Sequence, residues 1–263
     1  MNQLIAMVET QQIILIMPLF LLQIPANAAV FYNFVMQVTA FEILPMDLLY
    51  ESGFGWESTE IDRPNFDDEG FGSTLFLFNA GSMIIYVLLW PVLIVALLFA
   101  KGCVPCFSPQ RIKRWRNQLF WQMILVSIYE GYFVLCICML VNKYYDEYFT
   151  GVAQVTSFVF MVIFLFVLLT FPLLVAACLC FRFHKLHKDE VRESIGPLYT
   201  NLNLERGKII ILQPVTFLLR RLLLAYIVVF PIPLIFQYML LQMSIIWQMI
   251  VIFEVSPYAE SSY

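Results

Sequence analysis

Long apolar stretches alternate with short polar segments along the chain. A helix needs about 20 mostly apolar residues to cross a hydrocarbon core of about 30 Å. The pattern therefore predicts about six transmembrane helices, at about 12–44, 74–100, 119–141, 152–181, 209–230 and 234–254. We expect an all-α fold, a polytopic membrane helix bundle, with residues 1–263 forming a single membrane domain.

Prolines predict breaks in two of these stretches, because proline has no amide hydrogen to donate within a helix. Pro18 and Pro25 predict a kink in the first stretch. Pro231 and Pro233 divide the final apolar block, which is too long for a single helix. The last two helices should therefore form a tight hairpin.

Charged residues are segregated between the loops. Loop 45–73 holds one base, Arg63, and eight acids: Asp47, Glu51, Glu57, Glu60, Asp62, Asp67, Asp68 and Glu69. Thirteen of the fifteen lysines and arginines fall in segments 101–118 and 182–221. Cytoplasmic loops are enriched in Lys and Arg, so we expect both segments and both termini in the cytoplasm and the acidic loop outside. The pattern suits a plasma membrane or an endomembrane equally.

Two alternatives remain open for the N-terminal stretch. Residues 13–24 and the following Ala26-Asn27-Ala28 have the apolar core and small-residue site of a signal peptide, which would span residues 1–28. The preceding MNQLIAMVETQQ lacks the Lys or Arg usual in such a peptide. Residues 12–24 could instead form a re-entrant or interfacial segment. Neither alternative changes the sidedness of the later helices.

The composition excludes several classes of protein. Hydrophobic residues make up 61% of the chain and charged residues 13%, with a mean hydropathy of +0.81, whereas soluble domains are about half apolar and a quarter charged. No basic domain is present to bind nucleic acid. All six cysteines lie outside the acidic loop, so a secreted disulfide scaffold is not expected.

Three stretches resemble a known family: TQQIILIMPLFLLQIPANAAVFYNFVMQVTAFEILP (10–45), NFDDEGFGSTLFLFNAGSM (65–83) and PVTFLLRRLLLAYIVVF (214–230). They are similar to the membrane region of large multi-pass ciliate proteins with cysteine-rich, growth-factor-receptor-like ectodomains. With the spacing between them, they cover most of the chain. The architecture also loosely resembles the membrane domains of TRP-like and polycystin-like channels.

This sequence departs from that family in two ways. It has no cysteine-rich ectodomain, and it stops at SPYAESSY, where the family usually continues. We therefore expect either a short stand-alone member or a piece of a larger product. The resemblance implies a multi-pass membrane module and assigns no activity to it.

A single carboxylate, Glu130, interrupts the apolar run 119–141 within SIYEGYF. A charged acid near the bilayer centre costs several kcal/mol unless it is paired, protonated or hydrated, so Glu130 should face the bundle. Gly131 beside it permits close approach of another helix. One interpretation is an ion or proton site that lines a path. The other is a buried carboxyl that only fixes helix packing.

Other polar residues lie within the apolar helices. Asn79 belongs to a patch of small and amide side chains that is typical of helix contacts in lipid. Gln237, Ser244 and Gln248 follow one another at steps of seven and four, which places them on one helix face. With Glu130, these residues form a candidate permeation or intramembrane polar site. The stripe suits either a water-filled lining or a contact with a neighbouring helix.

Five bases are expected at the membrane interface: Arg220, Arg221, Lys113, Arg114 and Arg116. The arginine pair lacks the three-residue repeat of a voltage sensor and should snorkel to cytoplasmic headgroups. The other three lie in RIKRWRNQ, where a tryptophan among bases suits anionic headgroups. The short connection between the last two helices leaves no room for a pore loop of the tetrameric-channel kind.

We expect no metal site and no cofactor. Cys103 and Cys106 with His184 and His187 could hold zinc only if the two pairs met in space. The two cysteines are alternatively candidates for palmitoylation at a membrane edge. The segment PNFDDEG lacks the spaced acidic ladder of a calcium loop and is expected to be a solvated loop.

Two functional hypotheses follow. The first is a channel-like or transporter-like membrane module, with Glu130 and the Gln237, Ser244 and Gln248 stripe attracting cations. The second is a non-conducting structural anchor or partner-binding scaffold. We do not expect an enzyme, because the sequence contains no phosphate-binding loop, dinucleotide fingerprint or nucleophile–His–acid arrangement. The expected partner is the lipid bilayer, with homo-oligomers or other membrane subunits left open.

Overall fold

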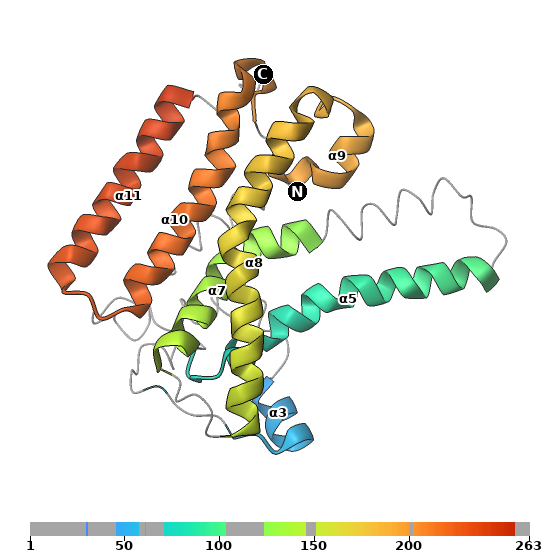
Figure 1. The fold of residues 1–263 in the computed structure, drawn as a ribbon, viewed down its shortest axis with the longest axis vertical. Helices are drawn as coiled ribbons and strands as arrows, with labels where there is room; N and C mark the ends of the chain where they lie inside the picture. Colours follow the sequence, from blue (N-terminus) through green and yellow to red (C-terminus); the bar gives the residue numbers. More distant parts are fainter. Residues whose placement is uncertain are drawn as a thin grey trace. The chain divides into compact units, whose positions relative to one another are not determined.

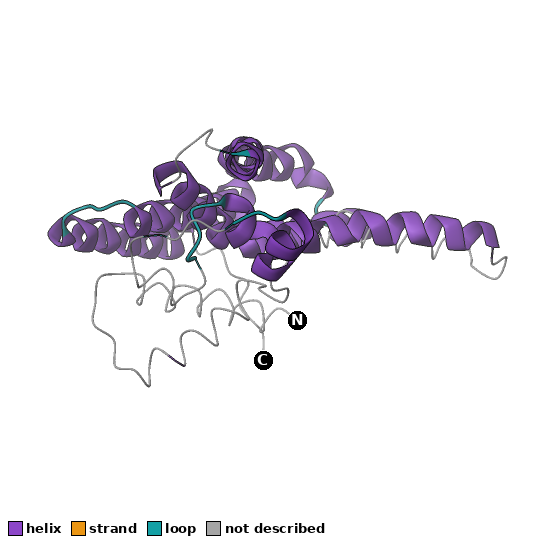
Figure 2. Cartoon of the chain, turned by 90° about the horizontal axis from the view of Figure 1, so that it is seen from below, coloured by secondary structure: helices purple, strands orange, loops and turns teal. Residues whose placement is uncertain are grey.

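The computed structural model describes residue 30 and residues 46–57, 61, 71–103, 124–145, 151–199 and 202–255. Its α-helices are α3 (Met46–Phe54), α5 (Phe76–Cys103), α7 (Ile124–Tyr145), α8 (Val152–Arg182), α9 (Asp189–Ile195), α10 (Leu212–Val229) and α11 (Leu234–Val255) (Figure 1). Three short 3₁₀ helices join α8 to α10: η3 (Phe183–Lys185), η4 (Gly196–Leu198) and η5 (Leu204–Ile211). This part of the chain contains helices and no strand, so the predicted all-α fold is confirmed (Figure 2).

Five described segments are long and apolar enough to cross a membrane: Phe76–Leu93, Ile124–Tyr145, Val152–Lys185, Leu204–Val229 and Leu234–Val255. They fall where the sequence predicts the last five helices. The first predicted helix, at 12–44, lies outside the described residues apart from Val30. Helices of this length and composition belong in a bilayer, so the chain is an integral membrane protein in contact with lipid.

Proline has different effects in different helices. Helices α5 and α8 continue through Pro91 and Pro172, which membrane helices tolerate because neighbouring groups satisfy the freed carbonyls. Between α10 and α11 two prolines end the helical hydrogen bonding: α10 ends at Val229 and α11 begins at Leu234. The amides of Phe236 and Gln237 donate to the carbonyl of Pro233 over 2.8 and 3.1 Å and start α11.

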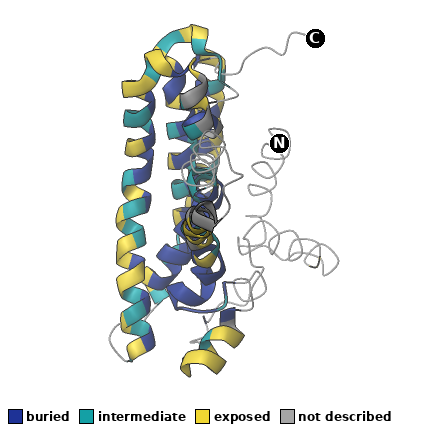
Figure 3. Cartoon of the chain, turned by 90° about the vertical axis from the view of Figure 1, so that its right-hand side faces the viewer, coloured by how far each residue is buried: buried dark blue, intermediate teal, exposed yellow. Residues whose placement is uncertain are grey.

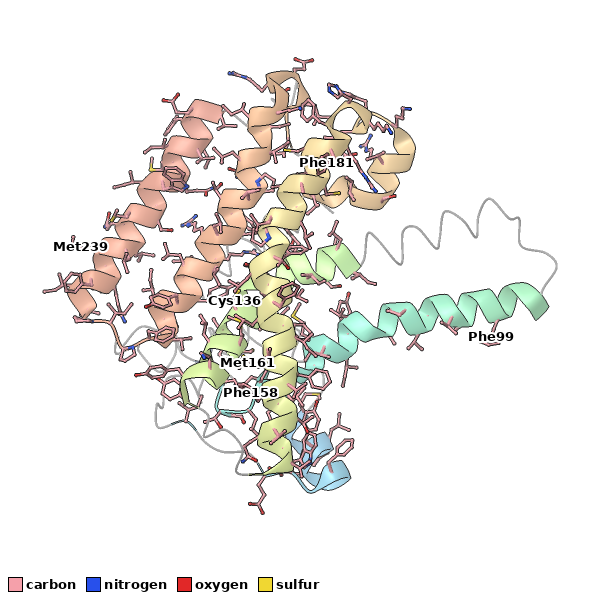
Figure 4. All side chains as sticks on the ribbon, in the orientation of Figure 1. Phe99, Cys136, Phe158, Met161, Phe181 and Met239 are labelled. Atoms are coloured by element: carbon pink, nitrogen blue, oxygen red, sulfur yellow. The ribbon has the colours of Figure 1, made fainter. Side chains whose placement is uncertain are left out.

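Apolar side chains cover much of the exposed surface. Within the span of α7, 67% of the residues are buried, but within α11 only 17% are. Exposed residues recur along the helices in Figure 3. Of the residues labelled in Figure 4, Phe99, Phe181 and Met239 are exposed, whereas Cys136 and Met161 are buried. Exposed apolar patches of this extent are rare on soluble monomers. They suit helices that contact lipid tails.

The chain packs as two compact units. Unit 1 comprises residues 1–84, 131–169 and 221–242, and unit 2 comprises residues 85–130, 170–220 and 243–263. Helices α5, α7, α8, α10 and α11 each contribute residues to both units.

Candidate intramembrane polar site

In unit 1, Asn79 caps the beginning of its own helix, α5. The Asn79 side-chain amide donates to the carbonyl oxygen of Ser73, and its Oδ1 accepts from the Ser73 amide over 3.3 Å. The Ser73 hydroxyl oxygen in turn accepts from the Leu75 amide over 3.1 Å. Asn79 is buried, so its polar atoms serve the backbone where α5 begins.

Two neighbouring helices hold the same end of α5. Asn142 of α7 donates from Nδ2 to the carbonyl oxygen of Thr74 over 2.8 Å. The amide of Leu77, in the first turn of α5, donates to the hydroxyl oxygen of Ser157 of α8 over 3.4 Å. Unsatisfied backbone groups cost several kcal/mol in lipid, so these side chains satisfy groups that the helix cannot. The sequence analysis missed Asn142 and Ser157, although each is a polar residue near the end of an apolar run.

Two glycines of unit 1 lie where another helix approaches closely. A Cβ placed on Gly131 of α7 would overlap the Cε and Sδ atoms of Met83 in α5. A Cβ on Gly81 of α5 would lie 2.6 Å from Cε of Met46 and 3.1 Å from the hydroxyl of Tyr50, both in α3. Small residues at helix contacts therefore set the packing of α3, α5 and α7.

Beyond Gly131, α7 is bonded to α8. Tyr132 is completely buried, and its hydroxyl donates to the carbonyl oxygen of Leu168 over 2.9 Å. Cys136 lies one turn further along α7, and the guanidinium of Arg221 in α10 is near enough to act on it electrostatically. Arg221 is only 4% exposed. Arg221 is therefore a cation buried within unit 1, beside α7. The sequence analysis had instead predicted that its side chain reaches the lipid headgroups.

In unit 2, Glu130 is buried in protein, with 7% of its side chain exposed. Ser127, three residues earlier on the same face of α7, is also buried. Tyr129 stacks on Phe217 of α10, with ring centroids 5.4 Å apart and an interplanar angle of 21°. The carboxylate therefore lies on the protein-facing side of α7.

The polar stripe of α11 contacts α10. In unit 2, the hydroxyl oxygen of Ser244 accepts from Nε of Arg220 over 3.2 Å. Gln248 donates from Nε2 to Oε1 of Gln213 over 3.5 Å, at the limit of a hydrogen bond. In unit 1, Gln237 donates from Nε2 to the carbonyl oxygen of Ile227 over 3.3 Å.

Those contacts form a regular pattern. The partner positions on α10 are 213, 220 and 227, seven residues apart, which keeps them on one face. Gln237, Ser244 and Gln248 are buried, while most other α11 residues are partly or fully exposed (Figure 3). Helix α11 thus directs its polar side toward α10. The sequence analysis missed Gln213. The signal that could have identified it is its position seven residues before Arg220, which puts both on one face of α10.

The structure describes only part of the remaining predicted site residues. Arg220 and Arg221 lie within α10, eight and nine residues after its first residue. Lys113, Arg114 and Arg116 lie outside the described residues. His184 and His187 are exposed, and Cys106 is outside the described part of the chain. Among the described residues, no group of three or more His, Cys, Asp or Glu is placed to hold a metal ion.

Comparison with protein-family models, with curated proteins and with solved structures finds no match to this chain.

Proposed function

We propose that the chain is a multi-pass membrane scaffold whose buried polar side chains hold its helices together. Helix α11 carries the proposal: its three buried polar residues are bonded to α10, and most of its apolar residues are partly or fully exposed. A helix lining a water-filled path would direct its polar face toward water. The contacts of Gln237, Ser244 and Gln248 instead support a helix pair that is fixed in register.

The end of α5 supports the same function. Asn79, Asn142 and Ser157 direct their polar groups at its backbone. Each bond joins a helix to its own end or to a neighbour. Polar groups used in this way stabilise an arrangement of helices and perform no chemistry, which fits an anchor for partners and does not require an enzyme.

A channel-like or transporter-like module is the second candidate, because ionisable residues lie inside membrane spans. Glu130 and Arg221 are both buried within apolar helices. Such residues are costly in a bilayer and often mark ion or proton pathways. In this alternative, Glu130 is the residue that attracts the transported cation.

The resemblance to ciliate surface proteins adds a cellular role to either function. In that role, the chain is the membrane region of a surface protein, with both termini in the cytoplasm and loop 45–73 outside. Self-association or other membrane subunits would complete the assembly. The strongly acidic loop and the basic segments on the opposite side support this orientation.

Ion flux through the purified chain in liposomes tests the proposal. We would compare the wild type, Glu130→Gln and the control Glu254→Gln, which removes an exposed carboxylate from α11. A scaffold predicts no flux from any of the three and a change in thermal stability for Glu130→Gln only. Flux that is lost in Glu130→Gln and kept in Glu254→Gln would replace the scaffold with the channel-like function.

A further inference from the structure

A cluster of basic side chains follows the end of α8. The stretch RFHKLHK, residues 182–188, contains three permanent cations, two histidines and no acid, and we call it the basic turn. All five of these side chains are exposed: Arg182, His184, Lys185, His187 and Lys188. The nearest acids in the sequence, Asp189 and Glu190, follow where α9 begins.

The basic turn adjoins a membrane span. The apolar span that contains α8 runs from Val152 to Lys185, so its last residues are already part of the turn. Phe181 directly precedes the turn and is 88% exposed, projecting from α8 in Figure 4. An exposed aromatic ring followed by exposed cations is the order expected where hydrocarbon gives way to headgroups.

The backbone of the turn is ordered by its own contacts. The amide of Leu186 donates to the Phe183 carbonyl over 3.2 Å, and that of Lys188 donates to the Lys185 carbonyl over 3.0 Å. The hydroxyl of Tyr199 donates to the Leu186 carbonyl over 2.9 Å.

Apolar side chains within the turn and after it are buried. Leu186 is buried, as are Ile195 and Leu198, which come after it in the chain. The exposed Arg192 lies near enough to Tyr199 to act on its hydroxyl electrostatically, so a further cation lies beside the turn. The bases are therefore presented by a fixed turn.

We propose that the basic turn binds the phosphate groups of anionic phospholipids. Phosphate oxygens accept charge-assisted hydrogen bonds from lysine and arginine. Basic residues beside a membrane span are attracted to anionic headgroups within a Debye length. Continuity with α8 favours lipid over an acidic protein, because a turn that ends a membrane span lies at headgroup level. The site is independent of whether the chain conducts ions.

Native mass spectrometry of the purified full chain tests this site, with phosphatidylglycerol or phosphatidylcholine added to neutral detergent micelles. The variant Lys185→Gln/Lys188→Gln removes two charges from the turn. The control Arg206→Gln/Lys208→Gln removes two exposed charges from η5. We expect the wild type and the control to retain phosphatidylglycerol preferentially. The turn variant should lose affinity for phosphatidylglycerol by roughly thirtyfold.

Equal losses in the two variants would overturn the proposal, because the attraction would then come from overall charge. A wild type that retains both lipids equally would also overturn it. In that second case, binding of a poly-glutamate peptide to the wild type but not to the turn variant would show that the turn is a protein-docking surface. Thermal unfolding in phosphatidylcholine should be the same for all three proteins, since every substituted side chain is exposed.

Discussion

At the scale of single residues, Gly131 matters most because a buried methionine occupies the space that a side chain would need. Met83 is 1% exposed and lies against Gly131, so it has little room to move. Gly53 of α3 is the opposite case, with nothing within 4 Å of an added Cβ. Substituting the two glycines therefore distinguishes a steric clash, expected only at Gly131, from the general effect of glycine on helix stability.

We predict that Gly131→Ala destabilises the protein by about 1–3 kcal/mol, because a tightly packed core must shift to accept the methyl group. Gly53→Ala should be neutral or stabilising, since alanine favours helices more than glycine does. Equilibrium unfolding in micelles measures both changes. Adding Met83→Ala should make Gly131→Ala less costly. If both glycine substitutions had the same effect, Gly131 would not be a helix contact.

Tyr199 gives a prediction about pH. Burial raises the pKa of Tyr199 above its usual value, an effect that nearby Arg192 partly offsets. The neutral hydroxyl is also the form that donates to the Leu186 carbonyl. With its pKa higher in the folded state, the group stabilises the fold fully below pH about 10. That stabilisation is lost as the pH rises through the folded pKa.

We therefore expect Tyr199→Phe to lower the stability at neutral pH by about 1 kcal/mol. It should also weaken the loss of stability that sets in as the pH rises above about 10. Thermal unfolding over this range measures both effects. The control is Tyr238→Phe, which alters an exposed tyrosine of α11. An unchanged alkaline dependence in Tyr199→Phe would show that another group causes it.

At the scale of elements, the bond between Gln213 and Gln248 tests whether polar contacts hold α10 against α11. Replacing either glutamine by leucine leaves the other amide buried without this partner, which should cost about 1 kcal/mol. The double substitution should cost less than the two single ones together, because neither amide is then left without the other. Met249→Leu, at an exposed neighbour, is the control. Additive losses would argue against the bond.

The beginning of α5 offers a second test of helix anchoring. Ser157→Ala removes the acceptor of the Leu77 amide and should destabilise the protein by about 1–2 kcal/mol. Thr156→Ala is the matched control, since the adjacent Thr156 hydroxyl donates to the Val152 carbonyl of its own helix over 2.7 Å. Hydrogen exchange at the first turn of α5 should increase for Ser157→Ala alone. Equal exchange in the two variants would remove Ser157 from the contact.

Sequence alone predicts the long helices and misses most of what joins them. Lipid imposes a length and a composition on a spanning helix, so the long helices could be predicted from the apolar runs. The break at Pro231 and Pro233 could be predicted because proline has no amide hydrogen to donate. Short helices such as α3 and α9 carry no comparable signal. The partners Asn142 and Thr74 are 68 residues apart in the chain. Contacts of this kind depend on how helices pack, which the pattern along one chain does not contain.

At the scale of the whole molecule, two features of the side chains agree. Apolar side chains are exposed along the long helices, and polar side chains within the helices are directed at other helices. This distribution is expected for a protein in lipid, where polar contacts hold helices together. The central claim is therefore that the polar face of α11 is a dry helix contact.

Reaction of Ser244→Cys with a small, water-soluble thiol reagent tests that claim in proteoliposomes with reagent on both sides. The reference is His187→Cys, at an exposed position of the basic turn, and the unsubstituted chain gives the background from its own cysteines. We predict that His187→Cys reacts rapidly and that Ser244→Cys does not react above background. Similar rates for the two cysteines would place water beside Ser244 and contradict the scaffold.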